Sequence, residues 1–156
     1  MLSQNYIDEI LSIYKEDHRY LHNVEYSRSD RKISGVFYPI VYPYTIEPTF
    51  DYVTSVTATL FVCQLAYVLY TTLIDEQDVD ELNYLNHETF LNLISDAKLK
   101  FMRYKFKFFA PVYNCGMITG SMKLDEVIKK KNKVFYRSSF WIGHGMRGEL
   151  LSFIID

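Results

Sequence analysis

Cysteine is scarce in this sequence, and its two residues, Cys63 and Cys115, stand far apart. A disulfide scaffold or a cysteine-rich zinc site needs more cysteines at closer intervals, so both are excluded. Cys63 lies within an apolar run, where a free thiol packs as a small hydrophobic group. We therefore expect a reduced, cytoplasmic protein.

Motifs for cofactors, metals and nucleophiles are also lacking. The sequence contains no glycine-rich phosphate loop and no nucleophile elbow, so we expect no bound cofactor. His18 and His22 are four residues apart but have no recognisable third partner, so we expect no metal site. The net charge of −2 provides no general attraction for phosphate backbones, which argues against a nucleic-acid partner. With only six Gly and four Pro, the chain is not dominated by tight turns.

Aromatic residues are abundant instead. They make up 17% of the 156 residues, with 14 Tyr and 11 Phe. Both residue types suit the half-buried, pleated surface of a β-sheet, and the length suits one domain over residues 1–156. The composition therefore favours a globular, sheet-containing protein.

The order of the expected elements indicates an α+β fold. A short amphipathic helix is expected within residues 1–17, with Ser3 or Asn5 as its N-cap, and another over 87–96. Strands are expected over residues 20–26, 32–38, 98–108, 117–128, 134–142 and 149–155, with turns over 29–32, 130–133 and 143–148. The alternation changes parity near Phe101, which predicts a β-bulge there. A hairpin, a long helix and a final antiparallel meander make up this arrangement.

The segment 51–75 could be a membrane span or the central helix of a soluble fold, because no charge lies between its terminal aspartates. Its hydroxyl and amide side chains make it a poor span, and no Lys/Arg cluster flanks it. The downstream strands need an apolar cover. We therefore expect a buried helix and no membrane span.

Within that helix, Thr54, Thr57, Gln64 and Thr71 fall on one stripe. The stripe could face a partner helix or a binding pocket. Alternatively, its hydroxyls bond the carbonyls one turn earlier. The sequence leaves both interpretations open.

Three stretches and the C-terminal end resemble the FcoT-like proteins, a hotdog-fold family named for a fatty acyl-CoA thioesterase. These are Arg19-Tyr20-Leu21, the helix Ser55 to Tyr67 with Gln64 and Tyr67 in register, the segment Phe108 to Leu124, and the ending FWIGHGMRGELLSF. The resemblance implies a single hotdog domain, in which an antiparallel sheet wraps around one long central helix. It also implies a homodimer with acyl pockets at the interface.

The sequence departs from this family where the chemistry is expected. Members tend to carry Gly-His-x-Asn and then Glu near the start of the central helix, and Tyr52, Thr54 and Thr57 stand at the His, Asn and Glu positions here. Asp51 is the carboxylate nearest the helix start, and it is either the general base or an N-cap. Tyr44 resembles the family's pocket tyrosine with a two-residue offset; the alternative is a loop aromatic that packs on the core.

What the resemblance implies for function is binding of acyl-CoA or acyl carrier protein thioesters. Thioester hydrolysis, or hydration and dehydration at the β-carbon of a fatty acyl chain, is the expected chemistry if the protein is an enzyme. Asp51, Tyr44 and Gln64 are then the predicted catalytic residues. The predicted substrate-binding residues are Tyr52, Thr54, Thr57 and Phe61. The missing His and Glu favour the alternative, a non-catalytic acyl-thioester binder with a regulatory or interaction role.

Overall fold

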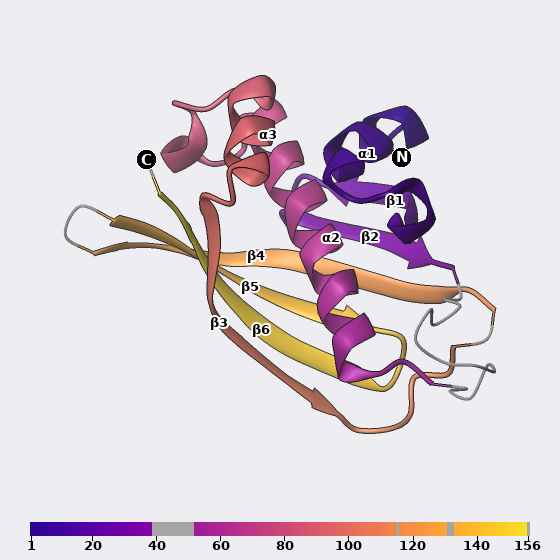
Figure 1. Ribbon diagram of the computed structural model, residues 1–156. Helices are drawn as coiled ribbons and strands as arrows, with labels where there is room; N and C mark the ends of the chain where they lie inside the picture. The colour runs from indigo at the N-terminus through magenta and orange to yellow at the C-terminus, as the bar shows by residue number, and fades with distance from the viewer. Residues whose placement is uncertain (39–51, 115, 131–132, 156) are drawn as a thin grey trace.

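The computed structural model describes residues 1–38, 52–114, 116–130 and 133–155, and one antiparallel sheet with a long helix on one face dominates it (Figure 1). The sheet has six strands in the order β1-β2-β4-β5-β6-β3. The strands are β1 Leu21–Ser27, β2 Lys32–Phe37, β3 Leu99–Phe108, β4 Ile118–Lys130, β5 Lys133–Ile142 and β6 Met146–Ile154. The helices are α1 Gln4–Ile10, α2 Ser55–Asp75 and α3 His87–Ser95. The predicted α+β fold with one central helix is thus confirmed.

Several predicted boundaries were wrong in detail. The N-terminal helix ends at Ile10, and two 3₁₀ turns, Leu11–Ile13 and Glu16–His18, replace the rest of the segment 1–17. The central helix begins at Ser55 and not at residue 51. The segment 143–148 is only partly a turn, because β6 already starts at Met146. The bulge near Phe101 is confirmed by a register shift between β3 and β6.

Local capping explains where the central helix starts. Thr54 is extended, with φ −78° and ψ 166°, and its hydroxyl accepts a hydrogen bond from the Thr57 N–H at 3.3 Å. This is the geometry of an N-cap, which satisfies one of the unpaired amides of the first turn. Thr54 is therefore the N-cap of α2, and the helix begins at Ser55.

Burial decides between the two interpretations of the uncharged segment. By length and composition α2 could span a membrane, but 78% of its most apolar stretch is buried inside the protein. The helix lies along the inner face of the sheet, where Phe61 stacks on Phe37 with ring centroids 4.0 Å apart. The segment therefore lacks charge because it is a helix of the protein core.

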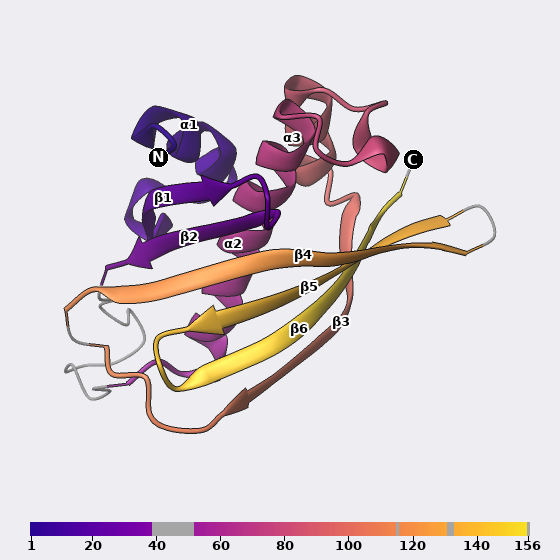
Figure 2. The same ribbon diagram turned by 180° about the vertical axis from the view of Figure 1, so that it is seen from behind.

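The two faces of the sheet differ in what covers them. All described helices lie on the inner face, and Figure 2 shows the opposite face in front of them. On β3, Tyr104 points inward and packs on Phe140, whereas the neighbouring Lys105 and Lys107 are exposed. The strands β1 and β3 are the two edges of the sheet.

Candidate functional site

A hollow of about 590 Å³ lies beside the first turn of α2. It is lined by Tyr52, Val53, Thr54 and Ser55 on one side and by Phe108, Phe109, Ala110, Pro111 and Val112 on the other. The Val53 N–H donates to the Val112 carbonyl at 2.7 Å, and Tyr52 pairs with Tyr113 as an isolated antiparallel bridge. These contacts hold the start of α2 against the segment that follows β3.

The chemistry of this hollow is that of a helix N-terminus beside apolar walls. The first-turn amides of an α-helix have no carbonyl partner within the helix, and the aligned peptide dipoles place about half a positive charge there. Among the described lining residues, the polar side chains are those of Tyr52, Thr54 and Ser55, and none of them is a carboxylate or an imidazole. The described walls can therefore polarise a carbonyl oxygen but supply no general base.

The structure brings only some of the predicted binding residues to this hollow. Tyr52 and Thr54 line it, and Tyr52 is 48% exposed. Thr57 and Phe61 do not line it, and both are buried in the core. Their roles in substrate binding therefore remain predictions.

The structure describes only one of the three predicted catalytic residues, Gln64. Tyr44 and Asp51 fall outside the described residues. Gln64 is fully buried, and its Oε1 accepts hydrogen bonds from the N–H groups of Tyr20 and Leu21, at 3.0 and 3.1 Å. Its Nε2 donates to the His18 carbonyl at 2.7 Å. The carboxamide thus ties α2 to the entry of β1, and a catalytic role for it remains a prediction.

The polar residues of the α2 stripe have three different roles. The Thr71 hydroxyl donates to the Tyr67 carbonyl at 2.8 Å, which is the bond to the preceding turn that the sequence left open. Gln64 bonds another element instead, and Thr54 caps the helix. The stripe is therefore no continuous pocket wall. Sequence reasoning missed the walls contributed by residues 108–112, although the resemblance had already marked that segment.

Cys63 lies on a half-exposed side of α2 and is a poor candidate nucleophile. Burial raises the pKa of its thiol to about 11. A thiol with this pKa holds almost no thiolate at neutral pH, and the thiolate is the reactive form.

We expect the alkylation of Cys63 by iodoacetamide to be slow at pH 8 and to accelerate only as the pH approaches 11. Peptide mapping by mass spectrometry of the folded protein measures this rate site by site. A Cys63 that is fully modified within minutes at pH 7 would contradict the expectation. The unfolded protein in urea is the control, since its thiol should react with the ordinary pKa of cysteine.

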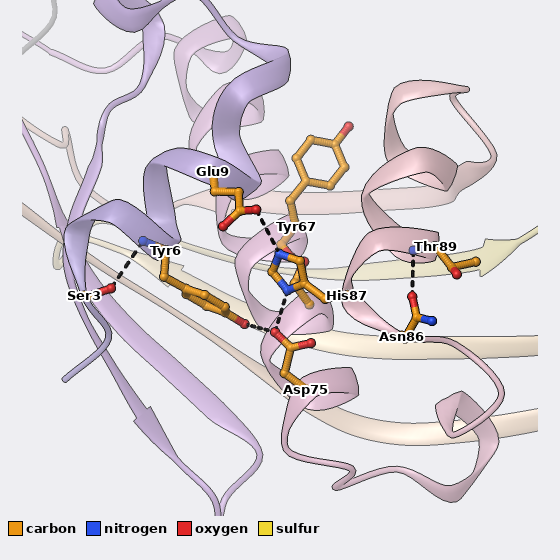
Figure 3. Close-up of polar contacts among 9 residues, drawn as sticks. Ser3, Tyr6, Glu9, Tyr67, Asp75, Asn86, His87 and Thr89 are labelled. Carbon is orange, nitrogen blue, oxygen red and sulfur yellow. Dashed lines mark hydrogen bonds and ion pairs between the residues drawn. The ribbon is translucent and has the colours of Figure 1, made fainter.

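A second group of titratable side chains lies at the other end of α2 (Figure 3). The Asp75 carboxylate accepts a hydrogen bond from the Tyr6 hydroxyl at 2.6 Å and contacts the His87 Nδ1 at 2.7 Å. The His87 Nε2 faces the Glu9 carboxylate at 3.7 Å. Burial and the contact with Asp75 both raise the pKa of the Tyr6 hydroxyl.

This cluster joins the three helices and does not serve the hollow. Tyr6 and Glu9 come from α1, Asp75 ends α2, and His87 begins α3. A helix of 21 residues is about 30 Å long, so Asp75 and the first turn of α2 are too far apart to act on one substrate group. No group of three or more possible metal ligands occurs among the described residues.

Comparison with solved structures identifies the architecture. The sequence itself matches no protein-family model and no curated protein. The structure aligns with a phenylacetic acid degradation-related protein from Ralstonia eutropha JMP134, described as a candidate thioesterase. The TM-score is 0.51 and the identity 8%, over 86% of this chain and 83% of that one. A candidate thioesterase from Syntrophus aciditrophicus SB gives a TM-score of 0.51 at 11% identity, over 97% of this chain and 95% of that one. At such identities the likeness shows the fold alone. A six-stranded antiparallel sheet around one buried helix is the hotdog fold, and this chain adopts it.

Proposed function

We propose that this protein binds acyl thioesters in the hollow beside the first turn of α2. The observation that carries the proposal is the position of a ligand-sized hollow at the positive end of a 21-residue helix. A thioester carbonyl oxygen placed there would receive the first-turn N–H groups and the helix dipole. The hotdog fold supports the choice of ligand, since two proteins that share it are described as candidate thioesterases.

The walls of the hollow suit the acyl part of such a ligand. Its volume of about 590 Å³ lies within the ordinary range for small-molecule sites. Phe108, Phe109 and Val112 supply apolar surface, and the hydroxyls of Thr54 and Ser55 lie beside the helix start. This combination favours a ligand with one polar carbonyl next to an apolar chain.

Thioester hydrolysis is the second candidate, and the position of Asp51 favours it. Asp51 directly precedes Tyr52, which lines the hollow. As a general base it would take a proton from water while the water oxygen bonds to the carbonyl carbon. The carbon–sulfur bond then breaks, and the products are a carboxylic acid and a free thiol. The same carboxylate and Tyr44 would serve hydration or dehydration at the β-carbon.

A homodimer with a cytoplasmic location completes the proposal. The edge strand β3 provides ten residues for pairing with a second copy. The end of this strand borders the hollow, so a partner there would add to its walls. Light scattering of the purified protein should give twice the chain mass.

The deciding experiment measures binding and turnover of acyl-pantetheine, a thioester without a nucleotide. The wild type should bind it, and Ala110→Trp, which fills the hollow from an exposed position, should weaken binding at least about tenfold, or about 1.4 kcal/mol. The matched Ala110→Ser variant keeps the hollow open and should bind like the wild type.

Release of free thiol, lost in Asp51→Asn, would establish hydrolysis. Saturable binding without thiol release would instead leave a non-catalytic acyl-thioester binder. If acyl-pantetheine does not bind at all, or binds equally to Ala110→Trp, the proposed site is wrong.

A further inference from the structure

Exposed apolar side chains gather at one end of the sheet. The ends of β2, β3 and β5 meet the starts of β4 and β6 there, because Phe37 pairs with Ile118 and Met146 pairs with both Phe108 and Ile142 (Figure 2). Among the described residues, twelve large apolar side chains are exposed, and six of them lie at or beside these strand ends. We call these six the aromatic end: Tyr38, Tyr52, Phe109, Tyr113, Met117 and Trp141.

The same end of the molecule carries positive charge. Its described segments contain three cations, Lys105, Lys107 and Arg147, and no Asp or Glu. These segments are 35–38, 52–56, 104–114, 116–121 and 139–148. Within the part of the chain that the structure describes, none of the three cations forms a salt bridge. In a chain with a net charge of −2, this separation of charge favours an anionic partner.

The cations and the rings lie together on the outer face of the sheet, away from α2. Arg147 on β6 is paired with Trp141 on β5 and with Lys107 on β3. The Arg147 guanidinium lies 4.4 Å and the Lys107 Nζ 5.3 Å from the ring centroid of Phe109, both in cation–π geometry. A hollow of about 590 Å³ on this face is lined by the three cations, Trp141, Phe109 and one carboxylate, Glu149. The surface therefore presents positive charge and apolar rings side by side.

A lipid bilayer with anionic headgroups matches both features. Trp and Tyr rings prefer the interface between the headgroups and the acyl chains, and Lys and Arg are attracted to the negative potential of anionic lipids. Exposed apolar patches with polar surroundings are typical of interaction surfaces. A nucleic acid binds mainly through its phosphates, so it would leave the exposed Tyr113 and Met117 beside the cations in water. The apolar side chains therefore favour the bilayer.

We propose that the aromatic end docks on the surface of a membrane that contains anionic lipids. Its rings and Met117 enter the interface between headgroups and acyl chains, and the three cations bind lipid phosphates. Phe109 lines both the outer hollow and the hollow beside α2, so docking places the latter hollow next to the bilayer. This inference goes beyond the proposed function and does not rest on it.

The only tryptophan of the chain reports docking directly, because Trp141 belongs to the aromatic end. Vesicles of phosphatidylcholine and phosphatidylglycerol in equal amounts should shift its fluorescence emission to shorter wavelength. Brominated acyl chains in the same vesicles should quench the emission. Vesicles of phosphatidylcholine alone should have neither effect. Flotation of the vesicles measures the bound fraction, which added salt should lower.

Two pairs of variants test the charged and the apolar contributions. Lys107→Ala should lower partitioning into the anionic vesicles about fivefold, whereas Lys100→Ala, exposed near the other end of β3, should leave it unchanged. Met117→Ser should lower it about tenfold, whereas Met102→Ser, exposed in the first half of β3, should not. Circular dichroism melting of all four variants separates a docking defect from a folding defect.

Several results would overturn the inference. Failure to bind the anionic vesicles would do so, as would equal binding to the neutral ones or equal weakening by the control variants. Binding without a change in Trp141 emission would place the docking surface elsewhere. Single-stranded RNA that binds more tightly than the vesicles would make this face a nucleic-acid surface instead. Acyl-pantetheine binding is measured without vesicles, so either proposal can fail while the other stands.

Discussion

Replacing Gln64 by Leu should lower the free energy of unfolding by roughly 3 kcal/mol or more. Leu keeps most of the volume but removes both polar atoms. The variant removes the hydrogen bonds that Gln64 makes with the N–H groups of Tyr20 and Leu21 and with the His18 carbonyl. Each buried polar group without a hydrogen bond costs about 1 to 3 kcal/mol, and Gln64 itself is fully buried. In a chain of this length, a loss of 3 kcal/mol lowers the melting temperature by about 10 °C.

Urea denaturation followed by circular dichroism measures this loss. Thr59→Ala is the matched control on the same helix, since Thr59 is exposed and its hydroxyl bonds the Ser55 carbonyl one turn earlier. It should change stability by no more than about 0.5 kcal/mol. A Gln64→Leu variant as stable as the wild type would contradict this prediction. It would show that water or another side chain forms hydrogen bonds with the backbone groups before β1.

The second large effect is expected at Gly148. A Cβ atom built there lies 2.2 Å from the Lys105 carbonyl oxygen and 2.5 Å from the Phe140 ring. The carbonyl belongs to the backbone of β3, so the clash can be relieved only if β3 and β6 move apart. Overpacking of this kind typically costs about 1 to 3 kcal/mol, and the backbone contact places Gly148→Ala at the upper end. The variant should also weaken binding of acyl-pantetheine, because Phe108 at the end of β3 lines the hollow beside α2.

Gly116→Ala provides the comparison for this prediction. Gly116 has φ +66°, and nothing lies within 4 Å of a Cβ atom at this position. The alanine in this variant is then strained only by the left-handed backbone conformation, which should lower stability by about 1 kcal/mol. Equal loss of stability in both variants would contradict the steric explanation for Gly148.

The general outline of the fold could be predicted because local patterns carry it. Alternation near Phe101 predicted both a strand and its bulge, and the order of the elements predicted an antiparallel sheet around one helix. The first and last residues of the helices and strands were harder to predict. Thr54 caps α2 with its hydroxyl, and the neighbouring Val53 N–H bonds the Val112 carbonyl. A sequence shows no such long-range bond.

The candidate site was predicted only in part, because some of its residues are placed by local structure and others by long-range contacts. Tyr52 and Thr54 lie at the start of the helix, so their place beside its amides follows from the chain alone. Gln64 falls on the same polar stripe, yet its partners are backbone groups more than forty positions away. A side chain that could orient a substrate and one that ties a strand to a helix look alike in a sequence.

By itself, the sequence determined that the uncharged segment forms a buried helix, Ser55–Asp75 in the structure, because its hydroxyl and amide groups and the absence of flanking cations oppose a membrane span. Only the tertiary structure decided which residues of that helix and of the sheet line a hollow. Residues such as Lys107, Trp141 and Arg147 are distant in the chain and become neighbours only when β3, β5 and β6 pair. The register of that pairing, and not local pattern, places three cations and an exposed ring around one hollow.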